Sequence, residues 1–170
     1  WEDTPDGRPG WQQRFLEGGF DVYCSDALER GRSSFAKSPE FFEGEVIFRS
    51  QQDAWRMFRF GPLDGFHVDR DKRTFFPGGQ WPEEATDQFQ MQVVGRWVGH
   101  DEITQQAYDE LVQKVGPCVI ISHSQSGAFS TQAAVNNPEL VKAVVTLEPS
   151  GGADATEAQM AALVAAGTKH

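Results

Sequence analysis

Residues 119–127 constrain the fold of this chain more than any other stretch, because an apolar run changes there into small and polar residues. The run 119–121 is β-branched throughout, which favours a buried strand. Beyond Ser124, apolar residues recur with a helical period as far as about residue 136. The sequence therefore predicts a strand, a tight turn with Ser124 at its apex, and a helix.

Helices and strands are expected to alternate on both sides of this turn. Within 101–115, apolar residues recur at every fourth position and predict a helix with one buried face; they are Ile103, Ala107, Leu111 and Val115. The run 141–147 predicts a second strand, and a last helix is expected over 155–166. Nearer the N-terminus, the patterns predict a helix over 11–17 and a strand over 20–24. This alternation indicates an α/β fold whose parallel sheet is covered by helices on both faces.

The segment 35–97 differs from the rest of the chain. It contains three of the five tryptophans and most of the phenylalanines, with Pro, Gly and charged residues scattered among them. Apart from a weak helical pattern in 48–60, no period persists. We interpret the segment as an irregular insertion that caps the sheet edge, within one domain spanning 1–170. Its aromatic residues either pack a small core of their own or line a substrate pocket, and both interpretations stay open.

Composition narrows the classes of function. A net charge of −10 argues against a nucleic-acid partner, and no apolar run approaches the roughly 20 residues of a membrane span. Neither a metal-ligand cluster nor a phosphate-binding glycine loop is recognisable, so we expect no cofactor. Cys24 and Cys118 lie in apolar runs and are interpreted as buried free thiols, with a disulfide left open. Because the chain opens on Trp1, we expect a fragment or a processed form.

A serine at the apex of a strand–turn–helix is typical of a nucleophile elbow. The crowding of such a turn requires small residues two positions before and after the serine, and Ser122 and Ser126 meet this requirement around Ser124. The backbone N–H of Gln125, at the positive end of the following helix, is a candidate oxyanion donor. A lone serine in a turn is usually a turn residue. The agreement of strand, helix and small neighbours favours a nucleophile here.

A serine nucleophile needs a base and a carboxylate that orients the base. Glu148 follows the strand 141–147 and would share the carboxyl edge of the sheet with Ser124; Asp26 is the main competitor, and Asp154 and Glu157 are weaker ones. None of the four histidines lies where a base is expected: His67 is in the insertion, His100 precedes a helix, His123 adjoins the nucleophile, and His170 is the last residue.

Residues 122–127 (Ser-His-Ser-Gln-Ser-Gly) resemble the elbow of the α/β-hydrolase superfamily, and most closely that of a bacterial-type esterase group with a serine–glutamate–histidine triad. The resemblance extends to 4–11, 19–23, 30–33 and 147–149. It implies a partial α/β-hydrolase fold, a parallel sheet flanked by helices with an aromatic-rich cap. It also implies a carboxylic-ester hydrolase that forms an acyl-enzyme on Ser124, uses Glu148 as acid and acts on small-molecule esters.

The same resemblance implies that parts of the site lie elsewhere. The histidine would follow His170, and the glycine-rich loop with the second oxyanion donor would precede Trp1. We therefore predict that this chain alone hydrolyses p-nitrophenyl esters poorly. Two alternatives remain: a lactonase, acyltransferase or haloperoxidase-like enzyme of the same fold, and a non-catalytic binding module on a hydrolase scaffold.

Overall fold

The structure is a computed structural model that describes residues 1–4, 7–33, 45–95, 97, 99–152 and 155–167. Helices and strands are mixed along the chain, which forms two compact units, Trp1–Val98 and Gly99–His170. The interpretation of 1–170 as one partial hydrolase domain, with an insertion over 35–97, stays a prediction.

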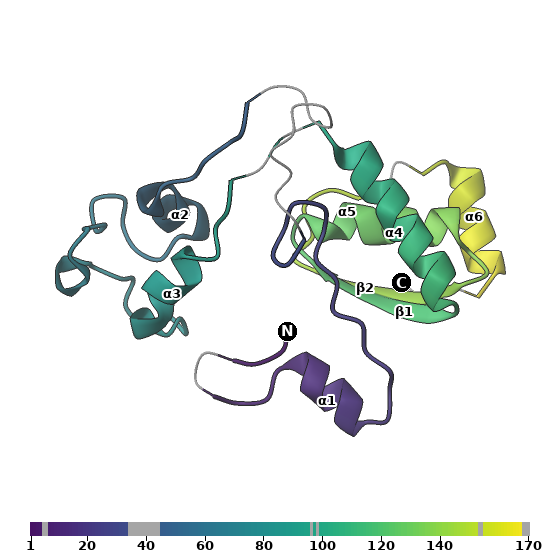
Figure 1. Ribbon diagram of the computed structural model, residues 1–170, viewed down its shortest axis with the longest axis horizontal. Helices are drawn as coiled ribbons and strands as arrows, with labels where there is room; N and C mark the ends of the chain where they lie inside the picture. The colour runs from purple at the N-terminus through teal and green to yellow at the C-terminus, as the bar shows by residue number, and fades with distance from the viewer. Residues whose placement is uncertain (5–6, 34–44, 96, 98, 153–154, 168–170) are drawn as a thin grey trace. The chain divides into compact units, whose positions relative to one another are not determined.

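The second unit contains the predicted parallel sheet. Its elements, in chain order, are α4 (Asp101–Val115), β1 (Cys118–His123), α5 (Ser126–Asn136), β2 (Val141–Leu147) and α6 (Glu157–Ala165). The strands β1 and β2 are parallel, with Ile120 opposite Val144 and His123 opposite Leu147. The helix α5 contacts both strands, and α4 and α6 both pack against α5 (Figure 1). The predicted helices and strands of this unit are therefore confirmed, with α6 starting two residues later than expected.

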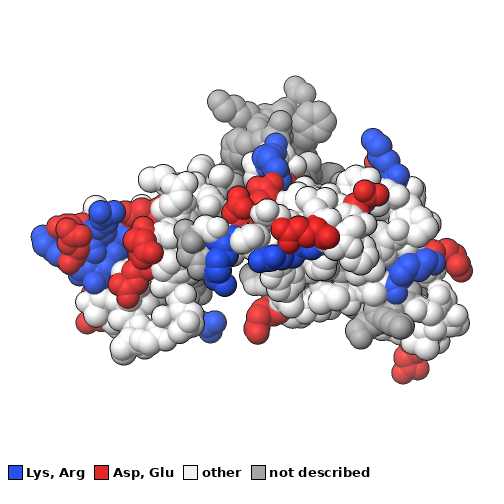
Figure 2. All heavy atoms as spheres, turned by 90° about the horizontal axis from the view of Figure 1, so that it is seen from below, with Lys and Arg blue, Asp and Glu red and all other residues white. Residues whose placement is uncertain are grey.

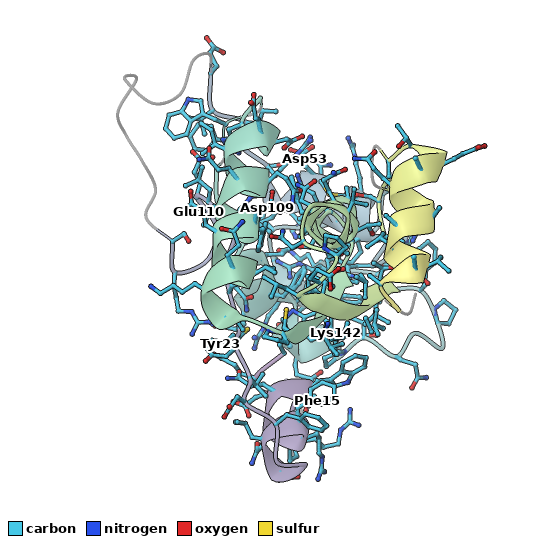
Figure 3. All side chains as sticks on the ribbon, turned by 90° about the vertical axis from the view of Figure 1, so that its right-hand side faces the viewer. Phe15, Tyr23, Asp53, Asp109, Glu110 and Lys142 are labelled. Atoms are coloured by element: carbon cyan, nitrogen blue, oxygen red, sulfur yellow. The ribbon has the colours of Figure 1, made fainter. Side chains whose placement is uncertain are left out.

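The three helices lie on one side of the two-stranded sheet (Figure 3). The core between them contains buried residues of α4, α5, β2 and α6: Val112, Ala133, Ala134, Val135, Val141, Val144 and Leu163. Side chains alternate across a strand, so Val119 and Val145 point to the opposite face, where they are 57% and 43% exposed. In the described residues of this unit, helices therefore cover one face of the sheet. The prediction of helices on both faces is not met there.

The buried face of α4 is rotated from the predicted one. Ile103 is 47% exposed and Ala107 is exposed, whereas Thr104 and Val112 are buried. Tyr108, between them on the same face, packs against Phe129 of α5 with ring centroids 6.1 Å apart. A spacing of four drifts around a helix of 3.6 residues per turn, so an apolar stripe alone defines its buried face poorly.

Polar contacts also hold α4 against the end of α5. Asp109 points from α4 toward α5 (Figure 3), where its carboxylate accepts hydrogen bonds from the side-chain amides of Asn136 (2.7 Å) and Asn137 (3.1 Å). The Asn137 amide also donates to the carbonyl of Ala133 (3.0 Å), near the last turn of α5. Such contacts satisfy polar groups where two helices meet, and a search for apolar periodicity does not detect them.

The first unit contains α1 (Trp11–Glu17), α2 (Gln51–Phe58), α3 (Thr86–Gln90) and the short 3₁₀ helices η1 (Arg70–Lys72) and η2 (Glu83–Ala85). The predicted helix 11–17 is confirmed, and α2 lies within the weak pattern at 48–60. The Ser50 hydroxyl and the Asp53 carboxylate form a capping box at the start of α2. The start of the predicted insertion, up to residue 44, lies outside the described residues.

The predicted strand over 20–24 is wrong. The segment has no strand conformation, and Phe20 and Tyr23 are 64% and 67% exposed. A strand exists only when a neighbouring strand pairs with its backbone groups, and in the described residues β1 and β2 form a two-stranded sheet with each other. Residues that favour extended backbone are therefore not sufficient to form a strand here.

Aromatic residues of the first unit pack a small core. Trp55 is fully buried, and its ring lies 4.8 Å from that of Phe75 and 5.9 Å from that of Phe60, measured between centroids. The indole N–H of Trp55 donates to the carbonyl of Pro62 (2.9 Å). Phe60 in turn packs against Trp81 at 4.8 Å. For these residues the structure favours the interpretation that they pack a small core of the segment over the interpretation that they line a substrate pocket.

Several further predictions concern the surface and the thiols. Cys24 and Cys118 are unpaired and half-buried, and burial raises the pKa of the Cys118 thiol. Among the described helices, none is long and apolar enough to cross a bilayer. On the face shown in Figure 2, acidic and basic side chains of the described residues are interspersed, so charges of one sign form no continuous patch there.

Candidate active site

Ser124 occupies a tight turn between β1 and α5. It follows the last residue of β1 directly and has a left-handed backbone, with φ +54°. Its N–H donates to the carbonyl of Leu147 (3.1 Å), and its carbonyl accepts from the N–H groups of Gly127 (3.0 Å) and Ser150 (2.9 Å). A side chain other than glycine is uncommon at positive φ, where the strain must be balanced by the surroundings. Ser124 is exposed, so its hydroxyl is accessible from solvent.

The turn is as crowded as the sequence pattern requires. Ser122 is buried, with 5% of its surface exposed, and Ser126 is half-buried. A Cβ atom added at Gly127 would lie 2.5 Å from the Cβ of Pro149. Real Cβ contacts are never that short, so the approach of Pro149 to α5 depends on the absence of a side chain at Gly127.

Glu148 lies at the same edge of the sheet as Ser124. His123 and Leu147 are paired at the ends of β1 and β2, and Ser124 and Glu148 are the next residue of each strand. Adjacent strands are about 5 Å apart, so the two turns are neighbours. The backbone bonds from Ser124 to Leu147 and from Ser150 to Ser124 join them directly. Glu148 is exposed and also has a left-handed backbone, with φ +46°.

The competing acids have other surroundings. Asp26, in the first unit, accepts hydrogen bonds from the backbone N–H (2.8 Å) and the Nε (3.1 Å) of Arg32. The bond from the backbone N–H of Arg32, helped by its guanidinium, holds the pKa of the Asp26 carboxyl below its usual value. Glu157 is the first residue of α6, where a carboxylate stabilises a helix N-terminus. Asp154 lies outside the described residues. Among the described candidates, Glu148 is thus the carboxylate that lies beside the turn of Ser124.

Gln125 connects the turn to α5. It is exposed, has φ −56° and immediately precedes Ser126, the first residue of the helix. The N–H groups of a helix's first turn point away from its carbonyls and carry the positive end of the helix dipole. An anion that develops beside Ser124 would meet this positive end.

The structure does not identify a base for Ser124. His123 is exposed at the end of β1, and His100 is buried at the N-terminus of α4. The ring of His67, in the first unit, accepts a hydrogen bond from the backbone N–H of Asp69 (2.9 Å). His170 lies outside the described residues. Within the described residues, Ser124 forms its hydrogen bonds through its backbone, and no group of three or more His, Cys, Asp and Glu residues could hold a metal ion.

The sequence reasoning missed one contact beneath the turn. The hydroxyls of Ser122 in β1 and Ser130 in α5 lie 2.8 Å apart in the core. The sequence shows a serine inside a β-branched strand and a second serine eight residues later on a helix. No periodicity or motif indicates that these two serines contact each other.

Comparison with known proteins shows a similarity to a probable lipase. No family model matches this chain. Over 162 residues, which cover 89% of the chain, it is 32% identical to a probable secreted lipase, phiG, of Fungal sp. (strain ATCC 74256). The chain spans 41% of the length of that protein. The similarity does not confirm the bacterial-type group with a serine–glutamate–histidine triad.

Proposed function

We propose that this chain carries the nucleophile and the acid of an ester hydrolase of the α/β-hydrolase fold. One observation carries the proposal: the left-handed backbone of Ser124 between the end of β1 and the start of α5. This conformation projects a serine hydroxyl away from the sheet while the next N–H faces the same space. The similarity to a probable secreted lipase supports a carboxylic ester as the substrate.

In the proposed reaction, the Oγ of Ser124 attacks the ester carbonyl and loses its proton to an imidazole. The N–H of Gln125 stabilises the oxyanion, and the alcohol departs with the proton that the imidazole returns. A water molecule then attacks the acyl-enzyme, which releases the acid and restores the serine. Glu148 orients the imidazole and stabilises its charged form. The imidazole belongs to a histidine that the described residues do not place beside Ser124.

The test is covalent labelling by a fluorophosphonate probe, with the modified residue mapped by mass spectrometry. Labelling is a single event that can be followed over hours, so it detects a nucleophile that turns over slowly. We expect the label on Ser124 and its loss in Ser124→Ala. Ser150→Ala is the matched control, because it removes an exposed hydroxyl from the adjoining turn and should label at the original rate. A label that persists in Ser124→Ala contradicts the proposal.

A second candidate is a non-catalytic binding module on a hydrolase scaffold. The observation that favours it is that, within the described residues, the hydrogen bonds of Ser124 run through its backbone to Leu147, Gly127 and Ser150. A chain that binds esters in equilibrium dialysis but never reacts with the probe would support this candidate. Lactonase, acyltransferase or haloperoxidase-like activity would share the same serine, and only a panel of substrates separates them from ester hydrolysis.

We also propose that the segment 35–97 is an insertion in this hydrolase domain. The support comes from its described residues, where α2, η1, η2 and α3 are all short and an aromatic core surrounds Trp55. Deletion of a cap should change the preference among acyl chain lengths more than the reaction with a small probe.

A further inference from the structure

Two buried hydroxyls join the strand that precedes Ser124 to the helix that follows it. Ser122 of β1 is 5% exposed, Ser130 of α5 is 6% exposed, and their Oγ atoms lie 2.8 Å apart. Ser122 lies two residues before Ser124 and Ser130 lies six residues after it. The contact therefore closes a loop of chain that has the candidate nucleophile at its apex.

The direction of this hydrogen bond follows from a neighbouring one. The Ser130 hydroxyl donates to the carbonyl of Gly127 at 3.0 Å, which uses its single proton. Both hydroxyl protons are then satisfied when Ser122 donates and Ser130 accepts. The result is an ordered chain of hydrogen bonds from β1 to Ser130 and on to the first turn of α5.

This chain of bonds reaches Ser124. Gly127, whose carbonyl accepts from Ser130, donates its own N–H to the carbonyl of Ser124 at 3.0 Å. The carbonyl of Ser124 also accepts from Ser150 of the adjoining turn. A residue at φ +54° keeps that backbone only while its surroundings hold it. The Ser122–Ser130 pair belongs to the contacts that hold it.

We infer that Ser122 and Ser130 are positioning residues, whose hydrogen bond sets the first turn of α5 on β1 and thereby orients Ser124 for reaction. The inference rests on the proposed function of Ser124. Simple core packing does not require a hydroxyl at either position, because an apolar pair of similar size fills the same space without a polar group to satisfy. Neither hydroxyl contacts substrate, and both act through the backbone of Ser124.

Stability and positioning can be separated by Ser122→Ala, Ser130→Ala and the double variant. In Ser130→Ala, the Ser122 hydroxyl stays buried without its acceptor, so this variant should have the lowest melting temperature of the three. The double variant has no unsatisfied hydroxyl and should recover a melting temperature close to that of the original chain. If the pair only stabilised the fold, amide exchange and probe labelling would also return to their original rates in the double variant.

The positioning readout is the exchange rate of the Ser124 and Ser150 amide hydrogens, measured by NMR on the full chain. Both amides donate across the two turns. In the double variant we expect both to exchange roughly fivefold to tenfold faster, the factor that one ordinary hydrogen bond contributes to an equilibrium. The Ile120 amide, within β1, should not change. Fluorophosphonate labelling should slow by a similar factor in its maximal rate, with unchanged affinity for the probe.

Thr131→Val is the matched control. The Thr131 hydroxyl donates to the same Gly127 carbonyl (2.9 Å) from the same helix, and it does not contact Ser122. This variant should keep the original exchange and labelling rates. The inference is overturned if the double variant keeps the original exchange rates at Ser124 and Ser150, or if Thr131→Val changes them equally. If the unaltered chain never reacts with the probe, the proposed function fails, and the exchange rates still decide whether the pair positions Ser124.

Discussion

Ser124 and Glu148 have the same uncommon backbone. Their φ angles are +54° and +46°, and each is the first residue after a paired strand end. For a residue with a Cβ atom this conformation costs about 1 kcal/mol or more. Two such residues at one edge of a sheet are a concentration of strain, which in folded proteins gathers at functional sites. A measurement of that strain therefore tests whether Ser124 has the left-handed backbone on which the proposed site depends.

The first prediction compares Ser124→Gly with Ser124→Ala. Glycine adopts positive φ without a steric cost, so Ser124→Gly should have a free energy of unfolding about 1 kcal/mol higher than Ser124→Ala. The measurement is urea denaturation followed by circular dichroism. The control is Ala158→Gly at an exposed position of α6, where glycine should instead be about 1 kcal/mol less stable than alanine. Equal or lower stability of the glycine variant at 124 would contradict the prediction.

The second prediction concerns pH and Asp26. Because the folded pKa of Asp26 lies below its ordinary value, its contacts with Arg32 stabilise the fold at higher pH and lose that effect as the carboxyl is protonated. The melting temperature of the original chain should exceed that of Asp26→Asn near neutral pH, and the difference should shrink below about pH 4.

Asp64→Asn, which removes an exposed carboxylate of the same unit, controls for the loss of one negative charge in this comparison. The prediction is wrong if the difference between the original chain and Asp26→Asn is the same at pH 7 as at pH 2.5, values that bracket the ordinary carboxyl range of about 3.9.

At the scale of elements, the close approach of Pro149 to α5 joins the turn of Glu148 to the helix that follows Ser124. Gly127→Ala would place a Cβ atom 2.5 Å from Pro149. Helix propensity alone favours alanine by up to about 1 kcal/mol. We nevertheless expect a net loss of about 1–3 kcal/mol in the free energy of unfolding, because the clash forces the two elements apart.

Gly152→Ala is the matched control for this third prediction, since nothing lies within 4 Å of the added Cβ atom. Chemical denaturation of both variants is the measurement. If Gly127→Ala is as stable as Gly152→Ala, the turn of Glu148 does not depend on this approach.

The fourth prediction concerns the attachment of α6. Leu163 is fully buried in the core, whereas Val164, the next residue of the same helix, is 71% exposed. Leu163→Ala should lower the free energy of unfolding by about 2–5 kcal/mol, and Val164→Ala should change it by less than about 0.5 kcal/mol. Thermal or chemical denaturation measures both. Equal effects would mean that α6 does not pack on α5 through Leu163.

At the scale of the whole molecule, the two compact units differ in their secondary structure. The parallel sheet and the turns of Ser124 and Glu148 all belong to Gly99–His170, and the aromatic core belongs to Trp1–Val98. Within the described residues, the hydrogen bonds of Ser124 run through its backbone to Leu147, Gly127 and Ser150. A general base contributes a factor of roughly 10²–10⁴ to such a reaction.

The fifth prediction concerns the base, which the described residues do not place beside Ser124. The 170-residue chain should hydrolyse p-nitrophenyl acetate slower than a complete serine esterase by roughly that factor of 10²–10⁴. Imidazole by itself hydrolyses this ester, so the Ser124→Ala sample measures that background, and added imidazole should accelerate the original chain beyond it. Turnover at the rate of an ordinary esterase, abolished by Ser124→Ala, would show that one of the present histidines already acts as base.

Local patterns by themselves determined the order of elements from residue 101 onward and the position of Ser124 at a turn. Apolar runs, helical periods and turn residues act between near neighbours in the chain, so their outcome depends little on the rest of the fold. The same patterns placed Glu148 at the end of a strand, but its nearness to Ser124 depended on which strand β1 pairs with.

Only the tertiary structure decided the features that depend on distant partners. The segment 20–24 is no strand because a strand requires a neighbour, and the face of α4 was decided by Tyr108 and Asp109 meeting α5. The bond between Ser122 and Ser130 likewise depends on how α5 crosses β1. Hydrogen bonds and packing between elements are chosen by their mutual geometry, which no single stretch of sequence specifies.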